Sequence, residues 1–162
     1  MLESRLDGIE PILTGTKPPK NRAIGYKYLL FEVSLEKGGE SYTANYLRGF
    51  EKEYILHSII GHGFCEELGD SFPEFNIPKR WPNNPRDDRR QIRDLVFEQD
   101  GLKLVVSGIG GGKYDLNNGS IIIHGKSEGF GPIPDNYVDK LRDLLEQLIQ
   151  KPAFEGYQVA IN

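Results

Sequence analysis

The sequence has little of what defines several common classes of protein. Its 162 residues include a single cysteine, Cys65, so no disulfide can form within the chain, as is usual in a reducing compartment. It has no apolar run of about 18 residues, and residues 1–22 have no apolar core of the secretory-signal type. We therefore expect a cytoplasmic protein with no membrane partner.

Positive charge is in the minority. The chain has 20 Lys and Arg against 24 Asp and Glu, which gives a net charge of -4. Because the phosphate backbone of nucleic acids attracts basic surfaces, this balance argues against nucleic acid as the main partner. With 38% hydrophobic and 27% charged residues, the composition is that of an ordinary globular domain.

Several catalytic and ligand-binding motifs are also missing. The "GGGK" at residues 110–113 lacks the spacing and the hydroxyl of a P-loop, and no G-x-G-x-x-G opens a predicted helix. The arginine of a tyrosine-phosphatase loop does not follow Cys65. The three histidines, His57, His62 and His124, have no companion ligands at zinc-like spacing, so we expect no metal and no cofactor.

The chain divides into an arm and one domain. Residues 1–23 are polar and contain a Pro-Pro pair, which predicts a flexible or loosely packed arm. Residues 24–162 have the length of a single domain. Within that domain, residues 69–90 contain four prolines, which predict an irregular insertion.

Segments rich in aromatic and β-branched residues predict the strands. Glycine and asparagine turns separate the first pair of strands and the second pair, which indicates two hairpins. The predicted strands are 26–35, 42–50, 102–116, 120–127 and 157–162.

Helical spacing of apolar residues predicts helices at 51–68 and 134–151, the second with Asp135 as its N-cap. Residues 88–101 also have helical spacing, and a strand that ends in an Asp100-Gly101 hairpin is the alternative. The predicted order is ββα(α)ββαβ. It describes a single α+β domain in which helices pack on a mixed sheet.

Four polar residues are candidates for function. An imidazole titrates near neutral pH, so His57 can serve as a general base or nucleophile; the alternative is a helix histidine that only contacts the sheet. Lys27 is either a functional cation or an outward charge on its strand. Arg48 is either a functional cation, a surface charge or the partner of an acidic side chain. His124 lies in an apolar strand, where we expect a structural role.

Two glycine-rich stretches lie on either side of the predicted strand 120–127. The first, "GIGGGKYD" at 108–115, predicts either a bulged strand end or a concave run of amides that binds anions. The second, "SEGFGP" at 127–132, allows the same two interpretations, and the hydroxyl of Ser127 would add a donor.

Five short blocks follow one another in order: "YKYLLFEV", "YLRGF", "EYILH", "SGIGGGKYD" and "IIIHGKSEGFGP", before an amphipathic helix and a terminal strand. This order resembles the janus family of small phosphohistidine phosphatases. The resemblance covers about residues 26–68 and 101–162, and leaves the arm and the insertion outside. It implies the janus-like fold and a metal-independent hydrolase that removes phosphate from phosphohistidine-containing proteins. We expect a monomer.

The resemblance also implies roles for individual residues. By its place in "RGF…EYILH", His57 matches the catalytic histidine of the family, and Lys27 in the first strand matches the substrate-binding lysine. The stretch after the "HGKS"-like strand matches a phosphate-contacting segment in which backbone amides do much of the binding. Its residues here are Ser127, Glu128 and Gly129.

The remaining matches are supporting positions. Arg48 matches the family's "RG" by position alone. Lys113 stands where the family usually has arginine, which removes bidentate recognition of an anion. The glycine run corresponds to Gly110, Gly111 and Gly112.

The residues leave the mechanism and one competing class of function open. His57 either takes a proton from attacking water or attacks phosphorus itself. Glu128 puts a carboxylate where a small or apolar residue is more usual, and this motivates the alternative of a phosphate-binding or phosphopeptide-binding module without turnover. A third interpretation is a regulatory protein that uses the 69–90 insertion as an interaction surface, through Trp81 and nearby phenylalanines.

Overall fold

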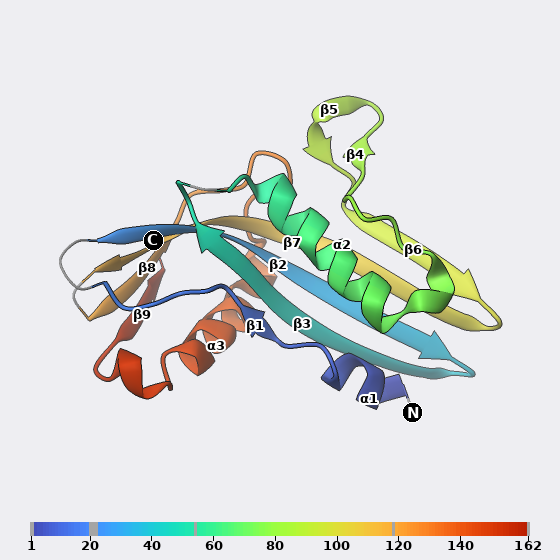
Figure 1. Cartoon of the computed structure of the whole chain (residues 1–162), viewed down its shortest axis with the longest axis horizontal. Helices are drawn as coiled ribbons and strands as arrows, with labels where there is room; N and C mark the ends of the chain where they lie inside the picture. The colour runs from blue at the N-terminus through green and yellow to red at the C-terminus, as the bar shows by residue number, and fades with distance from the viewer. Residues whose placement is uncertain (1, 20–22, 54, 118, 162) are drawn as a thin grey trace.

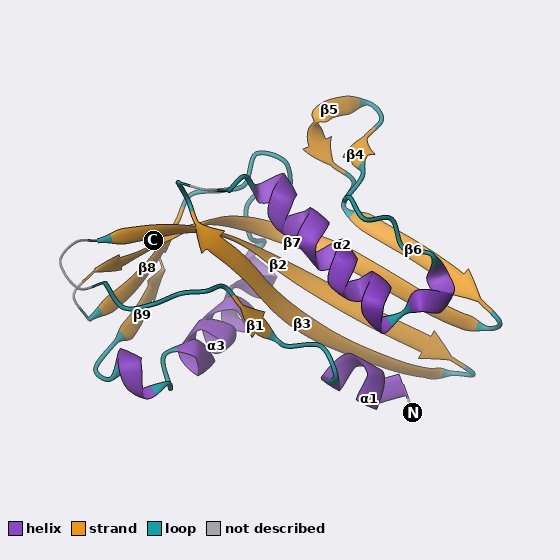
Figure 2. Ribbon diagram, viewed as in Figure 1, coloured by secondary structure: helices purple, strands orange, loops and turns teal. Residues whose placement is uncertain are grey.

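The computed structural model describes residues 2–19, 23–53, 55–117 and 119–161. These residues form an α+β structure with one main sheet (Figure 2). In chain order the elements are α1 (Leu2–Asp7), β1 (Ile12–Leu13), β2 (Ile24–Lys37), β3 (Glu40–Glu51), α2 (His57–Ser71), η1 (Pro73–Phe75), β4 (Asn83–Asn84), β5 (Asp87–Gln91), β6 (Asp94–Gln99), β7 (Leu102–Asn117), β8 (Ser120–His124), η2 (Asp135–Tyr137), α3 (Val138–Leu148), η3 (Pro152–Phe154) and β9 (Gln158–Ile161).

The main sheet is mixed, as predicted. Its strand order is β1-β3-β2-β7-β8-β9, with β6 also paired to β7. β1 runs parallel to β3 and β9 parallel to β8, and the other pairs are antiparallel. Because β2 occupies one edge of β7, β6 and β8 share the other: β6 pairs with residues 102–107 and β8 with residues 113–117. The stretch between them, residues 108–112, contains the glycine run.

Helices cover both faces of this sheet. α1 and α2 lie on one face and α3 on the other (Figure 1). Side chains of β2 alternate between the two cores, as the pleat of a strand requires. Leu29 and Phe31 belong to the core under α2, whereas Tyr28 and Leu30 belong to the core under α3.

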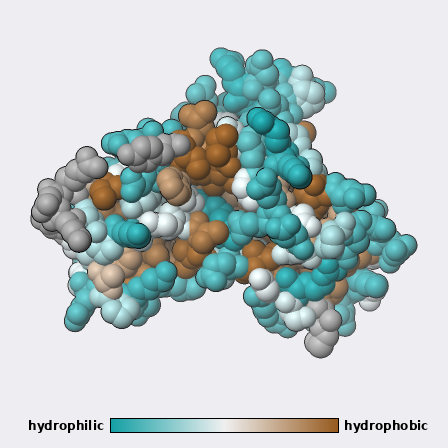
Figure 3. All heavy atoms as spheres, viewed as in Figure 1, coloured by the Kyte–Doolittle hydropathy of each residue, from teal (hydrophilic) through white to brown (hydrophobic). Residues whose placement is uncertain are grey.

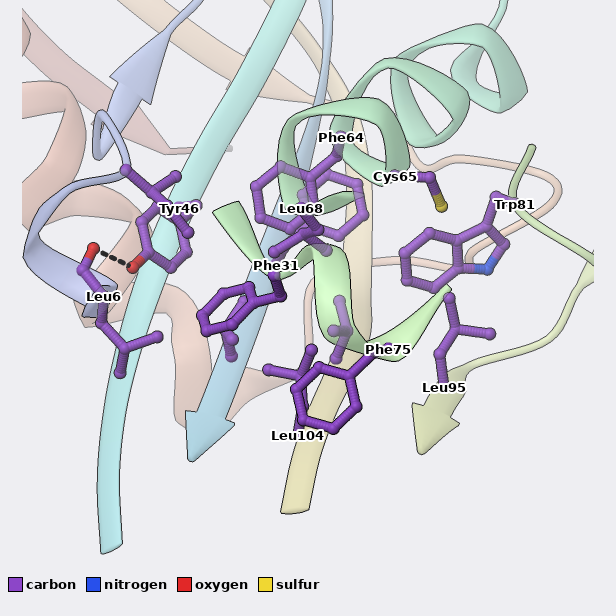
Figure 4. Close-up of a cluster of buried hydrophobic side chains, with 14 of the residues drawn as sticks. Leu6, Phe31, Tyr46, Phe64, Cys65, Leu68, Phe75, Trp81, Leu95 and Leu104 are labelled. Atoms are coloured by element: carbon purple, nitrogen blue, oxygen red, sulfur yellow. Dashed lines mark hydrogen bonds between the residues drawn. The ribbon is translucent and has the colours of Figure 1, made fainter. Parts of the chain in front are cut away.

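The core under α2 is rich in aromatic rings (Figure 4). The rings of Phe31 and Phe64 are stacked with their centroids 4.3 Å apart, and the Trp81 ring lies 5.4 Å from that of Phe31. The hydroxyl of Tyr46 donates a hydrogen bond of 2.8 Å to the carbonyl of Leu6, which ties α1 to β3. These contacts fix α2 across the long strands.

The helix predicted at 88–101 is wrong, and the alternative is confirmed. Residues Asp94–Gln99 form β6, which pairs with β7, so sheet pairing overrides the helical spacing of the apolar side chains. The turn that follows contains Asp100 and Gly101, both with positive φ, of 52° and 79°. This α of the predicted order is therefore a strand.

The boundaries of the first predicted helix also differ. α2 begins at His57, because Glu51 is still paired in β3, opposite Tyr26. It continues through Gly61 and Gly63 to Ser71, inside the predicted insertion. Tyr54, which falls within the predicted helix 51–68, lies outside the described residues.

Two further expectations need correction. Leu6 and Ile9 lie in the segment expected to be a loose arm, but both are buried and belong to the core under α2, so this part of the arm packs on the domain. The last helix, α3, begins at Val138 after the turn η2, with Tyr137 as N-cap and no side-chain cap. Asp135 therefore lies in η2 and is not the N-cap of α3.

Candidate active site

A cavity of about 840 Å³ lies where β2 and β7 pass the start of α2. The insertion forms one wall of the cavity, and the loop after β8 forms another. Five regions of the sequence thus meet here. The lining residues include Lys27, Leu56, His57, Ser58, His62, Arg80, Arg89, Lys113, Lys126, Asp88, Glu128 and Gly129.

His57 is the first residue of α2, and its ring has a defined hydrogen-bond partner. Its Nε2 lies 2.8 Å from the carbonyl oxygen of Gly112. Because a carbonyl oxygen can only accept, Nε2 carries the proton, and the neutral ring has its lone pair on Nδ1. The sheet therefore selects the tautomer that leaves Nδ1 as the basic and nucleophilic atom.

The surroundings of His57 also favour its neutral form. Burial lowers the pKa of the imidazole below its ordinary value of 6.5, and the positive charges of Lys27 and Lys113 lower it further. The hydrogen bond to Gly112 acts in the opposite direction and is outweighed. A neutral imidazole at physiological pH is the form that a base or nucleophile needs.

Two lysines lie side by side on the floor of the cavity. Lys27 of β2 and Lys113 of β7 are directly paired across the two strands, and both are half-buried and line the cavity. Like charges opposite each other in a sheet destabilise it. An anion bound between them would remove this repulsion.

The N-terminus of α2 adds further positive potential. The amides of Ile59 and Ile60 donate to the carbonyl of Leu56, and the helix has no side-chain N-cap. Within the part of the chain that the structure describes, the amides of His57 and Ser58 have no acceptor. Free amides at the start of a helix attract anions, and these two lie at the cavity beside Lys27.

The predicted phosphate-contacting residues after β8 have different places. Ser127 is buried; its amide donates to the carbonyl of Gly111 at 2.9 Å, and its Oγ accepts from the amide of Phe130 at 3.2 Å. It therefore holds the loop in shape and does not line the cavity. Glu128 and Gly129 do line it, and Glu128 is exposed. Among the described residues, the amides of these two find no acceptor.

The glycine run lets this loop approach the sheet closely. A Cβ atom on Gly110 would lie 2.3 Å from the carbonyl oxygen of Pro132, and one on Gly111 would lie 2.3 Å from that of Tyr28. A Cβ atom on Gly112 would lie 2.8 Å from the carbonyl oxygens of His124 and Gly125, at the end of β8. The pairing of β2 and β7 also shifts register here, so this is a bulged strand that forms a backbone wall.

Arg48 is a structural residue outside the cavity. It is 3% exposed and forms a two-pronged ion pair with Glu67 of α2, at 2.7 and 2.8 Å. It also donates to the carbonyls of Leu47 and Glu10. Of the interpretations considered for it, the partner of an acidic side chain is the correct one.

The insertion is built into the cavity. Trp81 is buried; its backbone amide donates to Nδ1 of His62 at 2.8 Å, and its indole donates to the carbonyl of Ile92 at 2.6 Å. The amide of Gln91 donates to the carbonyl of Gly129 at 2.9 Å. Phe72, Phe75 and Trp81 all belong to the core, so they cannot form the exposed interaction surface considered for the insertion.

Sequence reasoning missed His62 and the arginines of the insertion as lining residues. The signal for the arginines was present, since basic residues are concentrated in this stretch of an acidic chain. No pattern identified His62, because its place follows from how Trp81 folds back onto α2. The buried thiol of Cys65 has its pKa raised to about 11 by burial, which makes it inert.

No model of a protein family matches this chain, and no curated protein matches it either. In the described part of the chain, no group of three or more His, Cys, Asp and Glu residues could hold a metal ion. None of the helices described here combines the length and apolar character that crossing a membrane requires.

Proposed function

We propose that this chain is a metal-independent phosphohistidine phosphatase of the janus type, which acts on phosphohistidine-containing proteins as a cytoplasmic monomer. The observation that carries the proposal is the state of His57. Its tautomer is fixed by the hydrogen bond to Gly112, and its pKa is lowered. It also lies beside two paired lysines, whose mutual repulsion a bound phosphate would relieve. This arrangement supports the match of His57, Lys27 and the later blocks to the janus pattern.

In the proposed complex, the phosphoryl oxygens bind between Lys27, Lys113 and the free amides of the cavity. The amides of His57 and Ser58 approach from the helix, and those of Glu128 and Gly129 from the loop. Such donors stabilise the charge on the phosphoryl group as the P–N bond lengthens. Glu128 is exposed, and the proposal requires its carboxylate to turn to solvent so that only its amide faces the phosphate.

Two reaction sequences use the same atoms. In the first, water attacks phosphorus while Nδ1 of His57 takes its proton, the P–N bond breaks, and the substrate imidazole leaves after taking up a proton from solvent. In the second, Nδ1 attacks phosphorus, the substrate P–N bond breaks, and the substrate imidazole leaves and takes up a proton from solvent. The resulting phospho-His57 intermediate is then hydrolysed by water, which releases phosphate and regenerates His57. Turnover in heavy-oxygen water and isolation of phosphorylated His57 distinguish them.

The direct test compares His57→Gln with His57→Ala. The Gln amide can still donate to the Gly112 carbonyl but has no basic nitrogen in the place of Nδ1. Both variants should lose phosphate release from phosphohistidine by about 10² to 10⁴-fold, because that is the usual contribution of a general base. Full activity in either folded variant contradicts the assignment.

A binding module without turnover is the second candidate, and the carboxylate of Glu128 at the cavity favours it, since it repels a phosphate. This candidate predicts binding of phosphohistidine peptides with no release of phosphate. Under it, Glu128→Ala should tighten binding and still give no turnover.

A further inference from the structure

Residues 79–93, which cover the second half of the insertion and the three residues after it, have a charge opposite to that of the whole chain. They contain six Lys and Arg and two Asp, a net charge of +4, whereas the whole chain has a net charge of -4. This stretch includes β4 and β5, which project from the body of the molecule as a hairpin (Figure 1). Figure 3 shows the hairpin as a hydrophilic surface.

The base of this hairpin is held in place. Trp81 packs against Phe31 and Phe130, and its amide is bonded to His62 of α2. On the other strand, Gln91 is bonded to Gly129 of the cavity loop. The arginines next to these anchors therefore have a fixed relation to the cavity and are not on a free tail.

Arg80 is the cation best placed to bind a second anion. It lines the same cavity as His57 and lies close enough to His62 for its charge to lower the pKa of that imidazole, after burial. The ion pairs found among the described residues leave Arg80 without a carboxylate, whereas Arg89 is paired with Asp87 at 3.2 Å. The other charges at the cavity are Lys27, Lys113, Lys126, Asp88 and Glu128.

We propose that Arg80 forms a second anion subsite that binds an acidic side chain of the substrate protein close to its phosphohistidine. This inference rests on the proposed function of the cavity. It names the substrate class: histidine phosphorylated within an acidic segment.

The spacing along α2 fits this substrate class. His62 is five residues after His57, which is about 7.5 Å along a helix. Two residues of an extended peptide span at most about 7 Å. Because the charge of Arg80 acts on His62, we infer that an acidic residue at the second position from the phosphohistidine meets Arg80 when the phosphoryl group binds beside His57.

The test uses two synthetic peptides that differ only in charge. Each has a central phosphohistidine, and the second position on either side is Glu in one peptide and Gln in the other. Wild-type protein should show a kcat/KM higher by about fivefold for the Glu peptide, the upper range for a solvent-accessible ion pair. The preference should weaken as salt is added.

The matched variants are Arg80→Gln and Arg142→Gln. Both remove one arginine charge, but Arg142 lies in α3 on the opposite face of the sheet. Arg80→Gln should abolish the preference and leave turnover of the Gln peptide unchanged, whereas Arg142→Gln should keep it. Equal kcat/KM for the two peptides in wild type, or a preference that survives in Arg80→Gln, overturns the proposal.

The failure of this inference is distinguishable from failure of the proposed function. If neither peptide is dephosphorylated, binding is measured with the same peptides carrying a non-hydrolysable phosphonate. Tighter binding of the Glu peptide that is lost in Arg80→Gln still supports the subsite, and equal binding overturns it. A single-stranded oligonucleotide that competes with the Glu peptide through Arg80 and binds more tightly would assign the surface to nucleic acid instead.

Discussion

Helices cover both faces of the sheet, but the side chains beneath them differ: those under α3 are apolar, whereas the start of α2 borders a polar cavity. On one face, α3 places Leu141, Leu144, Leu145 and Leu148 on the sheet, and all four are buried. On the other, α2 buries Phe64 and Leu68 in its later turns, while its first residue, His57, is at the cavity.

The difference lies in where each helix ends relative to the strands. The end of the sheet near the start of α2 has Lys27 and Lys113 on the face toward that helix, where apolar side chains would otherwise complete the core. Figure 3 shows a hydrophobic area near the start of α2, and Phe50, Leu56 and Ile59 are among the exposed large hydrophobic residues. The α3 face serves stability, and one end of the α2 face is given over to the candidate site.

The largest expected effect on stability concerns the face of the sheet covered by α3. Leu145→Ala should lower the free energy of unfolding by about 3 kcal/mol, because Leu145 is fully buried and its removal leaves a cavity. Urea unfolding measures the loss. Phosphate release per folded molecule should stay unchanged, and a large fall would show that the two faces are not independent.

Two glycines, Gly111 and Gly63, allow the effect of close packing to be compared with the effect of helix propensity. Gly111→Ala should cost about 2 kcal/mol, because its Cβ would meet the Tyr28 carbonyl and displace the backbone. Gly63→Ala in α2 should instead stabilise by about 0.5 to 1 kcal/mol, since nothing lies within 4 Å of its Cβ and alanine favours the helix. Thermal unfolding of the two variants, measured side by side, should give changes of opposite sign.

Lys27→Met tests whether the paired lysines lower the stability of the sheet while they increase its affinity for substrate. Removing one of two paired lysines should leave the free energy of unfolding unchanged or raise it by about 0.5 kcal/mol. Affinity for phosphohistidine substrate should fall about tenfold, equivalent to about 1.4 kcal/mol. Leu30→Met, a substitution in the α3 core, serves as the control that alters a neighbouring strand position without changing charge. An unchanged affinity in Lys27→Met would remove this lysine from the site.

The smallest effect concerns pH. Burial lowers the pKa of His57 and of His62, so the unfolded chain binds protons more readily than the folded one. Their contribution to stability is present above the ordinary histidine value of 6.5 and is lost as the pH falls through the lower folded values. Activity should follow the same direction, flat at neutral pH and falling on acidification. In His62→Gln the free energy of unfolding should fall less on acidification than in wild type. A larger fall in that variant would contradict the assignment.

The sequence predicted the long strands and α3 because their apolar patterns are regular over many residues. It misassigned residues 88–101 because short segments can satisfy helical and strand spacing together, and pairing with β7 decides between them. His57, Lys27 and Lys113 were found as a set because the resemblance linked blocks far apart in the chain. The structural role of Ser127 was not found, and for Arg48 the sequence could not choose between an acidic partner and the other interpretations, because a buried hydrogen bond or ion pair depends on neighbours that only the folded chain supplies.

The loop that carries Glu128 and Gly129 takes the place of a strand along residues 108–112 of β7. Two backbone bonds hold it there, from Ser127 to Gly111 and from Gly111 to Gly131. Such a short ladder can open without unfolding the sheet, so hydrogen exchange at these amides reports local opening of the loop. A ligand that binds the loop should slow this exchange. The exchange rates of the Ser127 and Gly111 amides would then indicate whether the cavity is occupied.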